Sequence, residues 1–173
     1  MQAYGSETLV LWYNQNIKIL ETCRWNIRTL DEHKTLMQRM GSVEGDVPLW
    51  LTSLHLLGFR EVPKVVALNR NTFDHSNPVA FQQVLHFLFS QLVPDRAKAE
   101  FRDCWPILDK KQEAEFRRKV VTLVKEVQGT IITAPLPQIN PALFMSPGGP
   151  KFKTFLSNLS SQVTQRCSQR NWD

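Results

Sequence analysis

The 173-residue chain lacks any apolar run long enough to cross a bilayer, because a membrane-spanning helix needs about 20 apolar residues. The longest such run near the start, Leu9–Tyr13, is also too short for a signal-peptide core and follows no basic region. Hydrophobic residues make up 42% and charged residues 21%, as in ordinary globular domains. We therefore expect an intracellular, soluble protein with one folded domain and an appendage.

Cysteine is scarce, and its spacing excludes two common kinds of structural site. Cys23, Cys104 and Cys167 are far apart, and no Cys-x-x-Cys pair occurs. This spacing predicts neither a disulfide framework nor a zinc site. We expect the three thiols to be small apolar fillers or surface groups.

Catalytic signatures are absent as well. The sequence has no glycine-rich dinucleotide or P-loop motif, no HExxH and no calcium loop. Its four histidines show no metal-ligand spacing: His33, His55, His75 and His86. Asp74-His75 resembles half of a catalytic pair, but it precedes Asn77-Pro78, so a turn is the expected role. The sequence predicts no enzyme, no cofactor and no bound metal.

From residue 47 onward, the residues that commonly begin and end helices are spaced as helices require. Proline and glycine predict a helix over 47–57 that stops at Gly58, and Asn77-Pro78 predicts the start of a buried helix over 79–92. A further helix is expected over 95–105, anchored by Phe101 and Trp105. A short segment over 63–68 lies between the first two, and the prolines of 129–141 predict a loop. Residues 1–46 end in a turn-rich hinge and form an extension of uncertain structure.

A strongly amphipathic helix is predicted after Asp109, which can cap it with Gln112 as the reciprocal partner of a capping box. Its apolar stripe comprises Phe116, Val120, Leu123, Val124 and Val127. Its other side carries the basic residues Lys110, Lys111, Arg117, Arg118 and Lys119, most of which should face outward. They could form a functional patch. They could equally be a solvated face, because Glu113 and Glu115 lie among them and Glu115 can pair with Lys119.

The run Ser146–Phe152, SPGGPKF, is the most distinctive short motif. Glycine amides at a helix start, with Lys151 beside them, could cradle an anion. No buried strand or P-loop spacing precedes them, so a rigid turn that sets the angle of the last helix is favoured. That helix should bury Phe152, Phe155, Leu156, Leu159 and Val163.

The net charge of +5 is concentrated in the carboxy-terminal half, since residues 127–173 contain four basic residues and one acidic residue. This mild excess permits an acidic polymer as partner, either a nucleic acid or an acidic filament. Composition and pattern alone therefore indicate a compact helical interaction module.

Three runs in order carry a more specific resemblance: HFLFSQLVPD, FRDCWPILDKKQEAEFRRK and FMSPGGPKF. Over roughly residues 47–166 the sequence resembles the amino-terminal domain of the augmin complex subunit 6 family. The resemblance implies an all-α, calponin-homology-like domain over 47–166. Residues 1–46 would be an amino-terminal extension, and residues 167–173 a tail where coiled coil normally follows.

Augmin binds existing spindle microtubules and recruits the γ-tubulin ring complex during spindle assembly. The resemblance therefore implies a non-enzymatic binding domain in the cytoplasm and cytoskeleton, at the mitotic spindle and centrosome. Its expected partners are other augmin subunits, especially the similar domain of subunit 7, microtubules, and indirectly the γ-tubulin ring complex, with no nucleic acid and no membrane. The candidate microtubule contacts are Lys110, Lys111, Arg117, Arg118, Lys119, Lys151 and Lys153.

Two alternatives stay open. The domain could be a scaffold inside the complex that never touches a microtubule. Less favoured is a basic nucleic-acid-binding helical domain, because Glu113, Glu115 and Glu126 dilute the basic helix that would read the nucleic acid.

Overall fold

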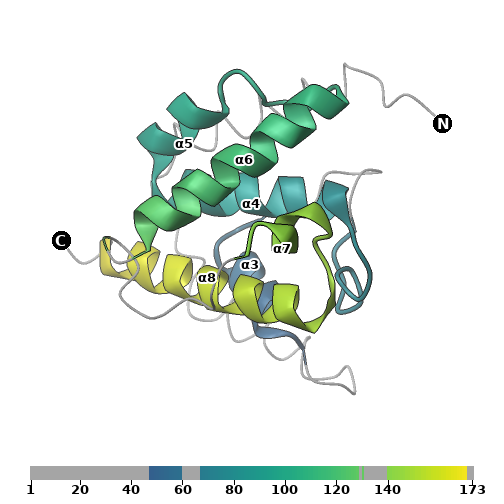
Figure 1. The fold of residues 1–173 in the computed structure, drawn as a ribbon. Coiled ribbons are helices and arrows are strands. Elements are labelled where there is room, and N and C mark those ends of the chain that lie inside the picture. The colour runs from purple at the N-terminus through teal and green to yellow at the C-terminus, as the bar shows by residue number, and fades with distance from the viewer. Residues whose placement is uncertain (1–46, 60–66, 129, 131–139, 171–173) are drawn as a thin grey trace. The chain divides into compact units, whose positions relative to one another are not determined.

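The computed structural model describes residues 47–59, 67–128, 130 and 140–170. This part of the chain contains six helices and no strand, which confirms the all-α prediction. Figure 1 shows them in chain order: α3 (Leu49–Leu56), α4 (Pro78–Leu92), α5 (Pro94–Phe101), α6 (Lys110–Val127), α7 (Ala142–Met145) and α8 (Gly149–Arg170). All six belong to one compact unit that begins at Pro48.

Local chemistry explains where the helices begin and end. The Asn77 side chain accepts a hydrogen bond from the Ala80 amide at 3.0 Å, and Pro78 occupies the first helical position of α4. Asp109 accepts in the same way from the Gln112 amide at 2.7 Å. Gly58, at φ +78°, stops the turn after α3 in a conformation that favours glycine.

Two sequence predictions need correction at helix ends. Helix α5 ends at Phe101 rather than Trp105, and turns fill the interval to Trp105. The Gln112 side chain accepts from the Leu108 amide rather than from that of Asp109, so the capping box is not closed reciprocally.

The core is built around α4, which packs against α5, α6 and α8. The Phe81 ring contacts the rings of Phe116 in α6, Phe144 in α7 and Phe152 in α8 at centroid distances of 5.7–6.0 Å. All four rings are buried. Burying a phenylalanine side chain contributes about 1.5–3 kcal/mol, so this cluster is a main source of stability.

Helix α3 closes the core on another side. It packs along α8 and contributes Trp50, which is fully buried. The Trp50 ring meets Phe73 edge-on at a centroid distance of 5.3 Å, and Phe73 in turn contacts Phe152 of α8. Aromatic contacts therefore run without a break from α3 to α4.

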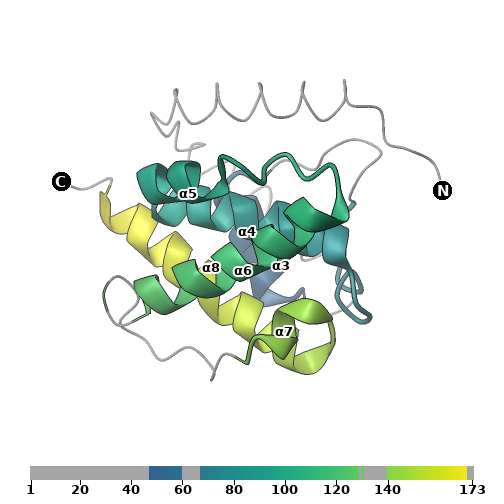
Figure 2. The ribbon, with the colours of Figure 1, turned by 45° about the horizontal axis from the view of Figure 1, so that its top comes forward.

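The three long helices begin at the same end of this unit. Phe81 lies in the first turn of α4, Phe152 in the first turn of α8 and Phe116 in the second turn of α6, and Phe81 is in ring contact with the other two. The Asn77 amide, just before α4, also donates to the Pro147 carbonyl, just before α8, at 3.0 Å. Figures 1 and 2 both show the starts of α4, α6 and α8 toward the right. We call this region the helix-start end.

Some predictions lie outside the described residues. These are the extension over 1–46 with Cys23 and His33, most of the segment over 63–68 and most of the proline-rich loop over 129–141. Within the described part, the apolar stripe of α6 is buried as predicted. In α4, which was predicted to be buried nearly all round, Phe87 is only half-buried.

Replacing Phe81 with alanine should lower the free energy of unfolding by about 3–5 kcal/mol, because a large cavity opens among three rings. Urea unfolding followed by circular dichroism measures this loss. Val79→Ala, in the same turn but 40% exposed, is the control and should change stability by less than about 0.5 kcal/mol. Equal effects of the two changes would contradict the described core.

Candidate functional site

The seven basic residues predicted as contacts fall into two groups. Lys110, Lys111 and Lys151 are exposed and form no ion pair within the described part of the chain. Lys110 and Lys111 begin α6, and Lys151 lies in the first turn of α8. These three side chains are therefore available to an acidic partner.

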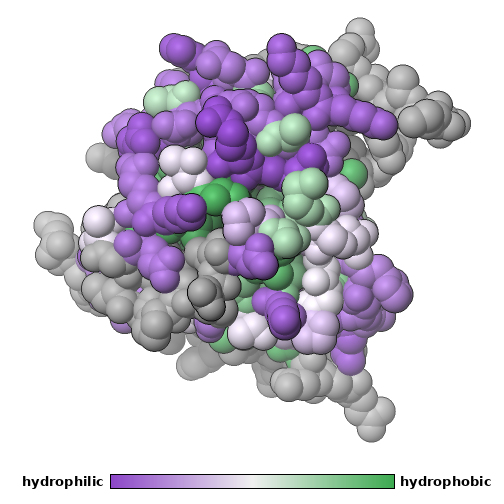
Figure 3. Space-filling model, viewed as in Figure 1, coloured by the Kyte–Doolittle hydropathy of each residue, from purple (hydrophilic) through white to green (hydrophobic). Residues whose placement is uncertain are grey.

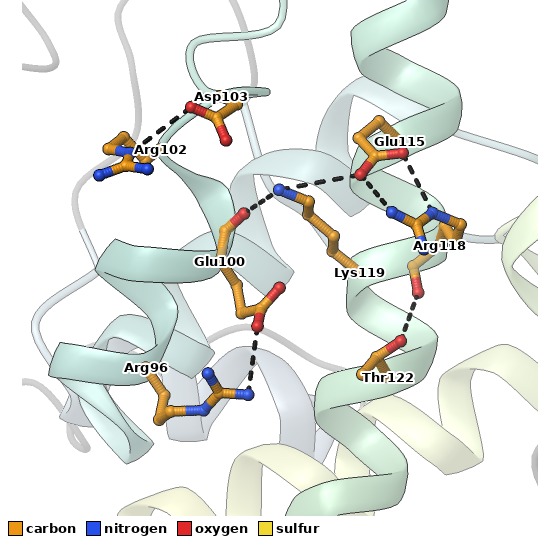
Figure 4. Close-up of polar contacts among 8 residues, drawn as sticks. All are labelled: Arg96, Glu100, Arg102, Asp103, Glu115, Arg118, Lys119 and Thr122. Atoms are coloured by element: carbon orange, nitrogen blue, oxygen red, sulfur yellow. Dashed lines mark hydrogen bonds and ion pairs between the residues drawn. The ribbon is translucent and has the colours of Figure 1, made fainter.

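The other α6 cations have acidic partners within the domain, although the Arg118 side chain is 70% exposed. Arg117 pairs with Glu113, and Arg118 pairs with Glu115 through two hydrogen bonds. Lys119 does not face outward as expected: its side chain is 12% exposed and donates to the Glu100 carbonyl of α5. It also lies 3.8 Å from Glu115, which confirms the predicted helix pairing. Figure 4 shows the contacts of Arg118 and Lys119 beside α5.

A second connection between the same two helices was not visible in the sequence. Arg96 at the start of α5 donates to both carboxylate oxygens of Glu126 near the end of α6, at 2.9 and 2.7 Å. The Arg96 guanidinium holds the pKa of the Glu126 carboxyl below its usual range. Arg96 also meets Glu100 at 3.1 Å. We call this set the ion-paired band: Arg96, Glu100, Glu113, Glu115, Arg117, Arg118, Lys119 and Glu126.

The SPGGPKF motif acts as a turn, as the sequence favoured. The Gly149 amide donates to the Phe73 carbonyl at 2.7 Å and therefore does not point at an external anion. A Cβ on Gly148 would lie 2.3 Å from the His75 carbonyl oxygen, so the two backbones touch closely. Lys153 pairs with Asp74 across this contact. Asp74 and His75 thus have the structural turn role that was expected of them.

The other histidines and cysteines of the described chain are His55, His86, Cys104 and Cys167. The His86 ring stacks on Trp105, with centroids 3.9 Å apart and planes at 8°, and burial lowers the pKa of His86 to about 3. His55 is exposed on α3. Cys104 and Cys167 are both buried, and burial raises the pKa of Cys104, which keeps that thiol protonated. Both cysteines are therefore the fillers that the sequence predicted.

Metal-binding and membrane-spanning features are not found in the described residues. No group of three or more histidine, cysteine or acidic side chains is arranged to hold a metal ion there. None of the helices described is both long and apolar enough to span a membrane.

By its geometry, the described part of the chain is an all-α domain built around an aromatic core, with lysines that have no ion pair on its surface. The sequence profile described as "HAUS augmin-like complex subunit 6 N-terminus" matches residues 50–172. The chain therefore belongs to the family of HAUS augmin-like complex subunit 6, in its amino-terminal part, which confirms the resemblance seen in the sequence.

Two curated relatives carry the same family name. The chain is 33% identical to human HAUS augmin-like complex subunit 6 over 132 residues, which is 71% of this chain and 14% of that protein. It is 37% identical to the zebrafish (Danio rerio) protein over 100 residues, which is 58% of this chain and 12% of that protein. The match thus spans only a small part of these relatives. The family consists of components of a structural complex.

Gly148→Ala should destabilise the domain by about 1–3 kcal/mol, because the new methyl group meets backbone atoms that cannot rotate away. Gly149→Ala meets no atom within 4 Å but must adopt φ +76°, which costs about 1–2 kcal/mol. Thermal unfolding of both variants measures these costs. A Gly148→Ala variant as stable as the unchanged protein would contradict the close backbone contact.

Stability should fall in mild acid because of His86. Its pKa is about 3 when folded and near 6.5 when unfolded, so protons bind preferentially to the unfolded chain between these values. Above about pH 6.5 the titration of His86 leaves the free energy of unfolding unchanged. As the pH falls from there toward 3, the free energy of unfolding decreases, and the loss reaches about 2 kcal/mol by pH 5. Urea unfolding at pH 7 and pH 5 tests this. In His86→Phe, which keeps a ring and cannot titrate, the acid-dependent loss should shrink by that amount, and an unchanged loss would contradict the assignment.

Proposed function

We propose that this domain is a non-enzymatic, calponin-homology-like module of an augmin subunit that pairs with the similar domain of subunit 7 and contacts microtubules. The family assignment supports the augmin role. The observation that carries the microtubule contact is the separation of the basic residues. Lys110, Lys111 and Lys151 are exposed and unpaired at the helix-start end, whereas the central cations of α6 are paired.

Electrostatics favours an acidic filament as the partner of these lysines. Microtubule surfaces are acidic, and exposed cations on a rigid domain gain from such a field at low ionic strength. The interaction weakens as salt rises, because the Debye length falls to about 8 Å at physiological ionic strength. A single domain with three unpaired lysines at this end binds weakly, so we expect strong attachment to need several linked modules.

The wider role follows from the complex. In the full-length protein, coiled coil after the domain would join it to other augmin subunits and, through them, to the γ-tubulin ring complex. The domain would then act at the spindle and centrosome in branching microtubule nucleation. Arg117, Arg118, Lys119 and Lys153 would serve this role indirectly, by holding the α5–α6 pair and the turn before α8 in place.

The ion-paired band argues against nucleic-acid binding. A recognition helix needs free basic side chains along its length, yet in α6 the central cations Arg117, Arg118 and Lys119 all have acidic partners. The scaffold alternative, in which the domain only pairs with another subunit, is tested by the experiment below.

The triple variant K110E/K111E/K151E should lose co-sedimentation with stabilised microtubules. The unchanged chain should pellet at about 50 mM salt and much less at about 150 mM. Reversing three unpaired charges should weaken apparent binding about tenfold or more.

The matched control is K98E/K125E/R166E, which makes the same total charge change at exposed positions on α5 and the later parts of α6 and α8. It should retain most of the binding. If the unchanged chain fails to pellet at low salt, direct contact is refuted and the scaffold role stands. Co-purification with the subunit 7 domain then tests pairing by itself.

A further inference from the structure

Three exposed apolar side chains lie at or near helix starts at the helix-start end. Four large apolar residues of the described chain are exposed, and three of them lie beside the starts of the long helices. Leu108 is 65% exposed just before α6, and Val79 is 40% exposed in the first turn of α4. Met145 is 66% exposed at the end of α7, four positions before Gly149, where α8 begins. A partner that carries apolar side chains could contact these three residues.

The same end is basic. The described stretches 68–79, 107–112 and 145–153 contain five lysine or arginine residues and two acidic residues. Both acidic side chains are engaged, because Asp74 pairs with Lys153 and Asp109 caps α6. The net formal charge of these stretches is +3, and Lys110, Lys111 and Lys151 form no ion pair among the described residues.

At each of the three helix starts, a backbone amide already has a hydrogen-bond partner. Asn77 caps α4, Asp109 caps α6, and the Gly149 amide at the start of α8 donates to the Phe73 carbonyl. A partner would thus be recognised by the lysine ammonium groups and the apolar side chains. The positive ends of the three helix dipoles add to the same field.

We propose that the helix-start end, comprising Val79, Leu108, Lys110, Lys111, Met145 and Lys151, binds an acidic polypeptide segment that also carries apolar side chains. Charge complementarity selects the acidic segment, and the three exposed apolar residues select one with apolar contacts to offer. This inference deepens the proposed microtubule contact by naming the surface and its chemistry, and it rests on the same lysines.

A polypeptide fits this end better than a membrane surface. A membrane-binding face needs a broad apolar stripe along one helix. Here the apolar side chains come one each from three separate segments, with polar and basic residues between them. In Figure 3 pale green and white residues are mixed with purple ones where α7 lies, whereas purple dominates the upper part of the view over α5 and α6.

The test measures binding of the full chain to a fluorescent peptide of about sixteen residues built from Glu-Glu-Leu-Gly repeats, by anisotropy at low and near-physiological salt. A matched peptide with serine in place of leucine removes the apolar contacts. The leucine peptide should bind at least about fivefold more tightly than the serine peptide. Either K110E/K111E/K151E or V79S/L108S/M145S should weaken binding of the leucine peptide about tenfold, and only the second should abolish the difference between the peptides.

The control K98E/K125E/R166E should keep most of the binding, and circular dichroism verifies that each variant is folded. The inference would be overturned if the control variant lost as much peptide binding as the other two variants, or if the two peptides bound equally well. Binding only to vesicles that contain phosphatidylserine would also overturn it. Microtubule pelleting without peptide binding would refute this inference and leave the proposed function standing. Peptide binding without pelleting would support this inference and refute direct microtubule contact.

Discussion

Burial of the Phe81 ring is the constraint on which the rest of the domain depends. One side chain on the central helix contacts rings from α6, α7 and α8 at once. Because Phe81, Phe116 and Phe152 lie in the first or second turn of their helices, their packing brings three helix starts to one end. The aromatic core thereby decides which surface residues become neighbours, although none of its members is exposed.

A second consequence concerns charge. Helix α5 runs back along α6, so that Arg96 at its start reaches Glu126 near the end of α6, and Lys119 reaches the carbonyl of Glu100. Together with the pairs inside α6, these contacts engage the cations in the middle of that helix. Of the five α6 cations predicted as contacts, Lys110 and Lys111 in the first turn are the two without an ion pair in the described structure. The basic run is therefore divided into residues that are paired within the domain and residues without an ion pair in the described structure.

Much of this could be predicted from the sequence, because the signals are local. Asn77-Pro78 and Asp109 specify caps, and the spacing from Phe116 to Val127 specifies a buried stripe. The ion pair of Arg96 with Glu126 could not be predicted, since thirty positions separate the two residues and no periodicity links them. The hydrogen bond of Lys119 could not be predicted either, because its acceptor, the Glu100 carbonyl, comes within reach only when α5 packs against α6. Nor could the sequence predict that Val79, Leu108 and Met145 lie at the same end of the domain.

The contact between α3 and α8 joins the first and last helices described. Trp50 and Leu54 are fully buried, and part of their cover comes from a helix that begins about a hundred positions later in the chain. During synthesis, α3 leaves the ribosome long before that cover exists. Its apolar face must therefore stay exposed, or be held by another protein, until α8 emerges, so the domain completes its fold only after nearly all of it has been made.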